Sequence, residues 1–214
     1  MNSHLMKFMQ NTYSQNSEDL FVLNYFGDFK GTLLEIGAND GVTFSNSKLL
    51  IDNGWKAHLV EPGYVNNDLS NLHNSNSNVA IYDIAIGDDD KIVALFESGT
   101  HIPGGNDRGL VSSASFEETK RWPGVKFDIR QISMITFANF YCKANYPHFD
   151  FISIDAEGFD AIILQQIDLK EVSCKCLCIE WNSKQELFDT FTGYCAQFGM
   201  RLGLQNAENL IFIK

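Results

Sequence analysis

The sequence predicts a doubly wound, Rossmann-like α/β fold built on a mostly parallel sheet. Short apolar segments of strand length alternate along the chain with segments of helical periodicity, which is the pattern of such folds. The apolar segments are almost continuous, as expected for parallel strands that are buried on both faces. A length of 214 residues suits one domain with a small addition, so we expect a helical extension over residues 1–30, packed on a main domain over 31–214.

Each expected strand is a short apolar run bounded by glycine, proline or polar residues. The main strands are expected at 31–37, 56–61, 78–86, 149–155 and 174–181. A further strand is expected at 91–98, and residues 200–214 are expected to form two strands around a turn.

The segments between the strands carry helix signals. Ser17 is a candidate N-cap for the first helix, and Gly54 is placed to end the second. The expected helices are 17–26, 44–54, about 64–72, the second half of 132–144, 159–167 and 183–199.

Composition narrows the function classes. The net charge is −11, from 27 acids and 16 bases, so binding to a nucleic-acid backbone is disfavoured. No apolar run approaches the roughly 18 residues of a membrane span. The first 20 residues lack the apolar region of a secretory signal, so we expect a cytoplasmic protein.

The five cysteines are expected to be free thiols. Three of them form "CKCLC" at 174–178, where alternation places all three on one face of a strand. The spacing is not that of a zinc site, so we expect packing in the core.

The stretch "LLEIGANDGVTFSN" places a glycine loop between a strand and a helix. It is not the G-x-G-x-x-G that seats a pyrophosphate, which disfavours a dinucleotide cofactor. Glycines let a backbone approach a ligand closely, and an acid without nearby bases suits a neutral or cationic group. The candidate cofactor-binding residues here are Glu35, Gly37, Ala38, Asn39 and Gly41.

Acids at the ends of two further expected strands indicate the kind of ligand. Glu61 closes the second strand, where an acid usually binds ribose hydroxyls. Asp83 lies near the end of the third strand, where a carboxylate can accept a hydrogen bond from an adenine amino group, and Ile84 follows it. These residues indicate an adenosine-containing ligand without a phosphate, and S-adenosylmethionine fits.

The chain resembles the FkbM-type family of S-adenosylmethionine-dependent methyltransferases. The resemblance extends over most of the chain, and its matching segments are "YSQNSEDL", "LLEIGANDGVTFSNSKLL", "GWKAHLVEP", "AIGD", "FDFISIDAEGFDAIIL" and "CIEWN". It implies a class I methyltransferase fold whose sheet closes with an antiparallel hairpin, and O-methylation, often of sugars or polyketide-type products. The chain departs from the family pattern at Gly63 and at Trp181, where relatives often carry asparagine and histidine.

Methyl transfer to a hydroxyl group requires a base within hydrogen-bond reach. Asp155 ends the fourth strand, Glu157 follows it, and Glu180 ends the fifth strand, so we expect these catalytic candidates at one edge of the sheet. Asp155 is also a cofactor candidate, whereas Glu157 and Asp160 are alternatively acids at a helix N-terminus. Asp155, Glu180 and Asn182 leave Mg²⁺ open as a cofactor but do not favour it, and no metal ligand is assigned.

Two segments are candidate gates. Ser14 and Gln15 in "YSQNSED" are predicted to meet the carboxylate end of the cofactor, together with Asp19, unless they cap a helix. The Gly/Ser-rich loop 99–115 is a candidate substrate lid, and His101 within it is a weak catalytic candidate.

The leading hypothesis is an enzyme that moves a methyl group from S-adenosylmethionine to a hydroxyl of a small molecule, a sugar or glycan or a natural product. A pseudo-enzyme that binds the cofactor without turnover and a methyltransferase acting on a protein partner remain open alternatives. The sequence does not determine the acceptor or the oligomeric state.

Overall fold

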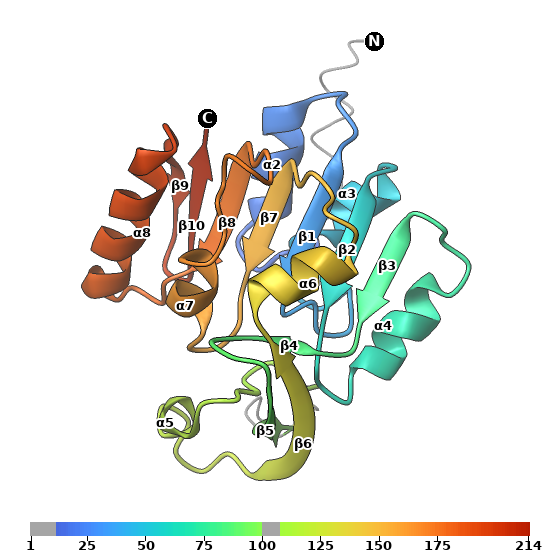
Figure 1. The fold of residues 1–214 in the computed structure, drawn as a ribbon, viewed down its shortest axis with the longest axis vertical. Coiled ribbons are helices and arrows are strands. Elements are labelled where there is room, and N and C mark those ends of the chain that lie inside the picture. Colours follow the sequence, from blue (N-terminus) through green and yellow to red (C-terminus); the bar gives the residue numbers. More distant parts are fainter. Residues whose placement is uncertain (1–11, 100–107) are drawn as a thin grey trace.

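A seven-stranded sheet forms the centre of the protein, in the order β3-β2-β1-β7-β8-β10-β9 (Figure 1). The structure is a computed structural model that describes residues 12–99 and 108–214. The strands of this sheet are β1 Thr32–Ile36, β2 Lys56–Val60, β3 Val79–Tyr82, β7 Phe151–Ile154, β8 Cys176–Glu180, β9 Arg201–Gln205 and β10 Asn209–Ile213. Strand β10 runs antiparallel to β8 and β9, and the other neighbours pair in parallel. The predicted α/β sheet with a C-terminal antiparallel hairpin is confirmed.

Helices cover both faces of this sheet (Figure 1). One face packs against α2 Glu18–Phe26, α3 Lys48–Asp52 and α4 Asn66–His73, through Val22, Leu50, Ile51 and Leu69. The other face packs against α6 Phe137–Lys143, α7 Asp160–Leu164 and α8 Gln185–Gln197, through Phe140, Ile163, Leu164 and Phe191. None of the helices in the described ranges is long and apolar enough to cross a membrane.

The cysteines of "CKCLC" are buried and free, so their packing in the core is confirmed. The prediction that all three share one face is wrong. Cys176 and Cys178 pack with α2 and α3, whereas Cys174 packs in the opposite cluster. Cys174 precedes β8, so the alternation of the strand does not extend to it.

A small second sheet lies at one end of the molecule, in the order β4-β6-β5 (Figure 1). Its strands are β4 Ala85–Ile86, β5 Lys91–Ser98, β6 Phe127–Ile135. The expected strand 78–86 is therefore wrong as a single element, because the chain leaves the main sheet after Tyr82 and pairs with β6 at Ala85. Strand β6 is not among the expected strands. The helix expected in the second half of 132–144 is confirmed as α6.

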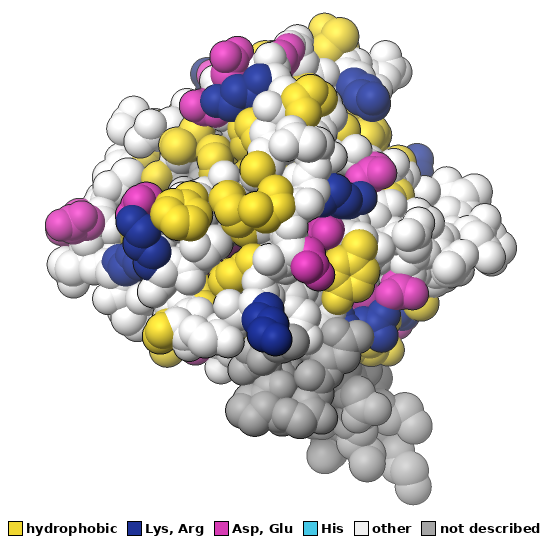
Figure 2. All heavy atoms as spheres, turned by 90° about the horizontal axis from the view of Figure 1, so that it is seen from below, with side chains coloured by type: hydrophobic (Ala, Val, Ile, Leu, Met, Phe, Trp, Pro, Cys, Tyr) yellow, Lys and Arg dark blue, Asp and Glu magenta, His cyan; other side chains and the backbone are white. Residues whose placement is uncertain are grey.

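The outer face of the small sheet carries exposed hydrophobic residues. Ile92 and Ile129 are exposed, and so is Phe116 in the short helix α5 Phe116–Thr119. Seen from below, this end of the molecule shows hydrophobic side chains in several groups between charged ones (Figure 2).

Two expected helix starts are wrong in detail. Ser17 precedes α2 with a left-handed φ of 66°, and its side chain makes no capping hydrogen bond. The second helix begins at Lys48 rather than at 44, because Glu35 accepts hydrogen bonds from the backbone N–H of Asn46 and the hydroxyl of Ser47. These bonds hold the chain away from helical geometry until Ser47.

Residues 12–17, which we call the N-terminal strap, run beside the glycine loop, where Ser14 forms a bridge to Phe44. Two buried carboxylates of α2 hold the strap. Asp19 accepts hydrogen bonds from the backbone N–H of Tyr13 and the hydroxyl of Ser14, and Glu18 accepts one from the backbone N–H of Asn16. The strap therefore has a defined path across the end of the sheet.

Candidate active site

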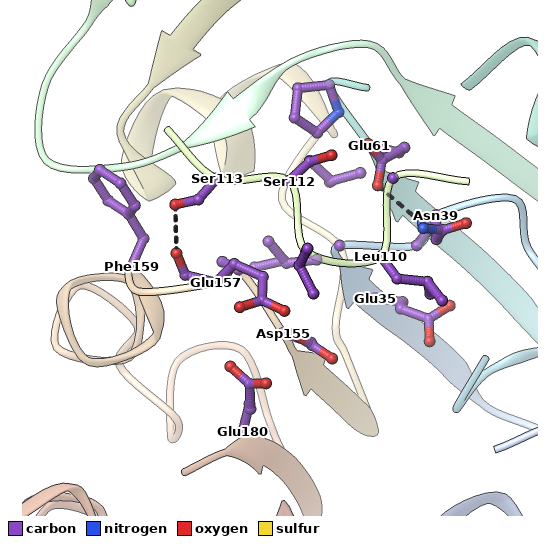
Figure 3. Close-up of a pocket in the computed structure, with 18 of the residues that line it drawn as sticks. Glu35, Asn39, Glu61, Leu110, Ser112, Ser113, Asp155, Glu157, Phe159 and Glu180 are labelled. Atoms are coloured by element: carbon purple, nitrogen blue, oxygen red, sulfur yellow. Dashed lines mark hydrogen bonds between the residues drawn. The ribbon is translucent and has the colours of Figure 1, made fainter. Parts of the chain in front are cut away.

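A cavity opens at the carboxyl ends of β1, β2, β7 and β8 (Figure 3). Its volume is about 300 Å³, at the lower end of the range typical of ligand pockets. This is the edge at which open α/β sheets bind their ligands. The predicted residues that line it are Gln15, Glu35, Gly37, Ala38, Asn39, Glu61, Ile84, Asp155, Glu157 and Glu180.

The glycine loop is shaped by its protein neighbours. A Cβ atom at Gly37 would overlap the carbonyl oxygen of Asp155, and one at Gly41 would lie 2.6 Å from Leu69 Cδ1. Both glycines also have left-handed φ angles, of 85° and 77°. The missing side chains therefore let the loop pack against β7 and α4, and only Gly37 faces the cavity.

Glu61 follows β2 directly and is buried, with 8% of its surface exposed. Its two oxygens accept hydrogen bonds from the backbone N–H groups of Asn39, at 2.9 Å, and Gly63, at 2.5 Å. Burial raises the pKa of Glu61 to about 7. Glu61 lines the cavity, and each carboxylate oxygen can accept a second hydrogen bond in addition to the one from the backbone.

Glu35 lines the cavity and also holds local structure. It accepts hydrogen bonds from the backbone N–H of Asn46, at 2.9 Å, and from the hydroxyl of Ser47, at 2.5 Å. Burial raises its pKa to about 7. Glu35 therefore fixes the chain between the glycine loop and α3.

Three predicted cofactor residues do not line the cavity. Asp83 is exposed, whereas the neighbouring Ile84 is buried and reaches the cavity wall. The hydroxyl of Ser14 donates a hydrogen bond to Asp19, and Gly41 packs against α4. Of the N-terminal strap, Gln15 faces the cavity.

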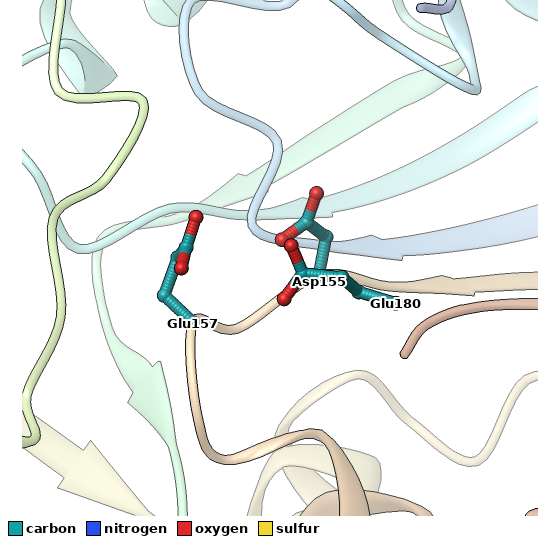
Figure 4. Close-up of side chains that lie close together, drawn as sticks. All are labelled: Asp155, Glu157 and Glu180. Atoms are coloured by element: carbon teal, nitrogen blue, oxygen red, sulfur yellow. The ribbon is translucent and has the colours of Figure 1, made fainter. Parts of the chain in front are cut away.

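The side chains of Asp155, Glu157 and Glu180, which we call the acid trio, meet in the cavity, where each offers a carboxylate oxygen within 4.8 Å of the others (Figure 4). Burial and then the neighbouring Asp160 raise the pKa of Asp155 to about 7. Burial, followed by the charge of Asp155, raises the pKa values of Glu157 and Glu180 well above their ordinary range. A carboxylate with a pKa near 7 can exchange a proton at neutral pH.

Asp160 has the structural role that the sequence left open for it. Its carboxylate accepts hydrogen bonds from the backbone N–H groups of Ala156, at 2.8 Å, and Gly158, at 3.1 Å. It therefore fixes the turn that carries Glu157, whose own φ angle of 42° is left-handed.

Residues 108–122, which we call the insertion segment, form a wall of the cavity. The sequence does not identify the individual residues of this wall. The hydroxyl of Ser113 donates to the carbonyl oxygen of Glu157 at 2.6 Å (Figure 3). A Cβ atom at Gly158 would lie 2.5 Å from Glu118 Cγ, so the segment packs closely on the turn that follows β7. Arg121 and Trp122 also line the cavity.

The only sequence signal for this wall was the length and composition of the loop 99–115. Residues 100–107 of that candidate lid, with the candidate His101, lie outside the described residues.

The strand order, the cavity and the acids at the strand ends define a class I methyltransferase fold. A family model described as the methyltransferase FkbM domain matches residues 35–202. The chain belongs to this family of S-adenosylmethionine-dependent methyltransferases.

Similar solved structures are distant in sequence. The precorrin-6y C5,15-methyltransferase of Geobacter metallireducens is 10% identical, with a TM-score of 0.48 over 95% of this chain and 89% of that one. The ribosomal protein L11 methylase of Lactobacillus delbrueckii subsp. bulgaricus is 11% identical, with a TM-score of 0.48 over 96% and 80%. The human methyltransferase 10 domain containing protein is 9% identical, with a TM-score of 0.48 over 91% and 80%. No curated protein matches the sequence significantly.

Proposed function

We propose that this enzyme transfers a methyl group from S-adenosylmethionine to a hydroxyl of a small molecule, a sugar or glycan or a natural product. The observation that carries the proposal is the acid trio, which places carboxylates of raised pKa in the cavity beside the glycine loop. A hydroxyl group must lose a proton as it is methylated, and such a carboxylate accepts it.

The cofactor is assigned to the part of the cavity between β1 and β2. Glu61 binds the ribose hydroxyls, and Ile84 provides an apolar wall for the adenine. The sulfonium lies toward Asp155, whose charge favours a cation. Because the sulfonium activates the methyl group, the protein mainly has to hold the acceptor oxygen in line with it.

The choice of a small acceptor rests on charge. The net charge of −11 and the acids of the cavity oppose a polyanionic substrate. An acceptor screen with free sugars, glycans, peptides and RNA tests this choice, with transfer of labelled methyl as the readout.

The first experiment is a calorimetric titration of S-adenosylmethionine and its demethylated product, with NAD as the control ligand. We expect micromolar binding of the first two and none of NAD. Binding without transfer to any acceptor class would favour a pseudo-enzyme, and transfer to peptides would favour a protein partner. Folded protein that binds neither nucleoside contradicts the proposal.

A further inference from the structure

The first residues of the insertion segment connect two walls of the cavity. The backbone carbonyl of Arg108 accepts a hydrogen bond from Nδ2 of Asn39 in the glycine loop, at 3.1 Å. Five residues along, the hydroxyl of Ser113 donates to the carbonyl oxygen of Glu157 at 2.6 Å. Residues 109–113 all line the cavity (Figure 3). This stretch therefore joins the glycine loop to the turn that follows β7.

The side chain of Arg108 strengthens the connection to the glycine loop. Its Nε lies 3.3 Å from the carboxylate of Asp40 in that loop, and its Nη2 pairs with the carboxylate of Asp68 in α4. Asp40 is buried and accepts hydrogen bonds from the backbone N–H groups of Val42 and Thr43, at 2.9 and 2.7 Å. One guanidinium therefore holds the insertion segment, the glycine loop and α4 together.

Arg108 can influence the cofactor only through other residues. Arg108, Asp40 and Asp68 are not among the described residues that line the cavity. Asn39, whose side chain bonds to the carbonyl of Arg108, donates its backbone N–H to Glu61 at 2.9 Å. Glu61 is the proposed acceptor for the ribose hydroxyls, so a continuous set of contacts leads from Arg108 to the cofactor site.

We propose that Arg108 is a positioning residue for the cofactor, because its ion pairs with Asp40 and Asp68 hold the glycine loop and the insertion segment in the geometry that binds it. Partly exposed ion pairs contribute little to global stability. A preformed site nevertheless binds more tightly, since the loops need not be ordered when the ligand arrives. The effect on the cofactor rests on the proposed function, whereas the effect on the mobility of the free protein does not.

The first measurement needs no ligand. The backbone N–H groups of Val111, Ser112 and Ser113 are hydrogen-bonded in this structure, so their hydrogen exchange reports local opening of the segment. Arg108→Ala and Asp68→Asn should each increase exchange over residues 109–113 at least fivefold in the free protein.

The second measurement is a titration with S-adenosylhomocysteine, the demethylated product of the cofactor. Arg108→Ala should bind at least fivefold more weakly, mainly through faster dissociation. Added salt should weaken binding to the wild type, because it screens the ion pairs, and should have little effect on Arg108→Ala. Arg108→Lys should recover part of the affinity, since lysine has a single nitrogen group where arginine reaches the two acids with different nitrogens.

Lys120→Ala is the matched control. It removes a basic side chain of the same segment that pairs with Glu117, and it should leave exchange and affinity within twofold of wild type. Thermal melting confirms that each variant is folded.

Unchanged exchange over 109–113 in folded Arg108→Ala and Asp68→Asn overturns the inference, and so does faster exchange with unchanged affinity. Equal losses of affinity in Arg108→Ala and Lys120→Ala also overturn it, because the charge of the segment and not the contacts of Arg108 would then be responsible. Faster exchange in Arg108→Ala, combined with a folded wild type that binds no S-adenosylhomocysteine, supports the ion pairs and contradicts the proposed function.

Discussion

The backbone N–H of Asn39 donates to Glu61 at 2.9 Å and thereby ties the glycine loop to the acid that closes β2. Glu61 is buried, and burial raises the pKa of its carboxylate to about 7. Glu61 therefore holds the loop and is also the residue that we propose as the acceptor for the ribose hydroxyls of the cofactor.

This relationship predicts that cofactor affinity depends on pH. Ribose hydroxyls donate to the ionised form of Glu61, which in the free protein is the minor form below its pKa of about 7. The affinity for S-adenosylhomocysteine should therefore rise up to about tenfold per pH unit below 7 and level off above it. Calorimetry between pH 5.5 and 8.5, in buffers of different ionisation enthalpy, measures the affinity and the proton released.

The control for this dependence is Glu61→Gln, which cannot ionise. It should bind at least tenfold more weakly at pH 8, which is about 1.4 kcal/mol, and its affinity should vary less with pH. An unchanged pH dependence in folded Glu61→Gln would assign the titration to another group, of which Glu35 is the first candidate.

Glu18 should act as a positioning residue for the N-terminal strap. It is fully buried and accepts hydrogen bonds from Asn206 and Asn209, at 2.8 and 2.9 Å, as well as from Asn16 in the strap. Burial alone would raise its pKa, but these hydrogen bonds lower it, so the carboxylate stays ionised.

Glu18→Gln directs an amide N–H₂ toward these donors, so we expect a loss of about 1–3 kcal/mol in the free energy of unfolding. Release of the strap should also weaken cofactor binding and increase hydrogen exchange over residues 12–17. Gln15→Ala is the matched control, since it removes a cavity-lining side chain of the strap and leaves the Glu18 contacts in place. If Glu18→Gln loses stability without faster exchange in the strap, the residue is structural only.

Phe44 combines a cavity-lining side chain with an unfavourable backbone conformation. The residue lines the cavity and is 47% exposed, and its φ angle of 56° is left-handed. A non-glycine residue in this region costs roughly 1–2 kcal/mol. We expect Phe44→Gly to fold at least as stably as wild type and to raise the KM for cofactor or acceptor severalfold.

Phe44→Ala separates the two effects, because it removes the ring and keeps the strained backbone. It should reproduce the KM change without the gain in stability, as measured by urea denaturation and steady-state kinetics. Wild-type KM values in both variants would remove Phe44 from the binding surface.

The sequence predicts the main sheet and strand β5 of the small sheet well, but it misses β6, for a physical reason. Strands buried on both faces appear as apolar runs, as in β7 and β8, where every residue is buried. Strand β6 is mostly exposed or half-buried, so its sequence "FDIRQISMI" contains polar residues and shows no continuous apolar run. Its pairing with β5 depends on contacts between residues up to 43 positions apart, such as Lys91 with Met134, which no local pattern encodes.

The same division applies to the active site. Glu35, Glu61, Asp155 and Glu180 lie directly at strand ends, so topology alone places them at one edge. The insertion segment reaches the cavity through tertiary contacts, such as the hydrogen bond from Ser113 to Glu157. Asp83 was misplaced because the chain turns into the small sheet immediately after it.

Alanine substitutions at Gly37 and Gly41 of the glycine loop, compared with one at Gly54 outside it, test why the loop lacks these side chains. Alanine at Gly54, Gly41 or Gly37 adopts a left-handed φ in each case. At Gly54 nothing lies within 4 Å of the new Cβ atom, so we expect only the conformational cost of about 1–2 kcal/mol. At Gly41 the new atom meets the flexible end of Leu69 at 2.6 Å, which adds about 1–3 kcal/mol for repacking.

At Gly37 the new atom meets the backbone carbonyl of Asp155, which cannot move without displacing β7 and the acid trio. Gly37→Ala should therefore be the most destabilised of the three in urea denaturation. Gly41→Ala should retain cofactor affinity, since its site does not line the cavity. If Gly41→Ala lost cofactor affinity while remaining as stable as Gly54→Ala, the second glycine would serve the ligand and not the packing of α4.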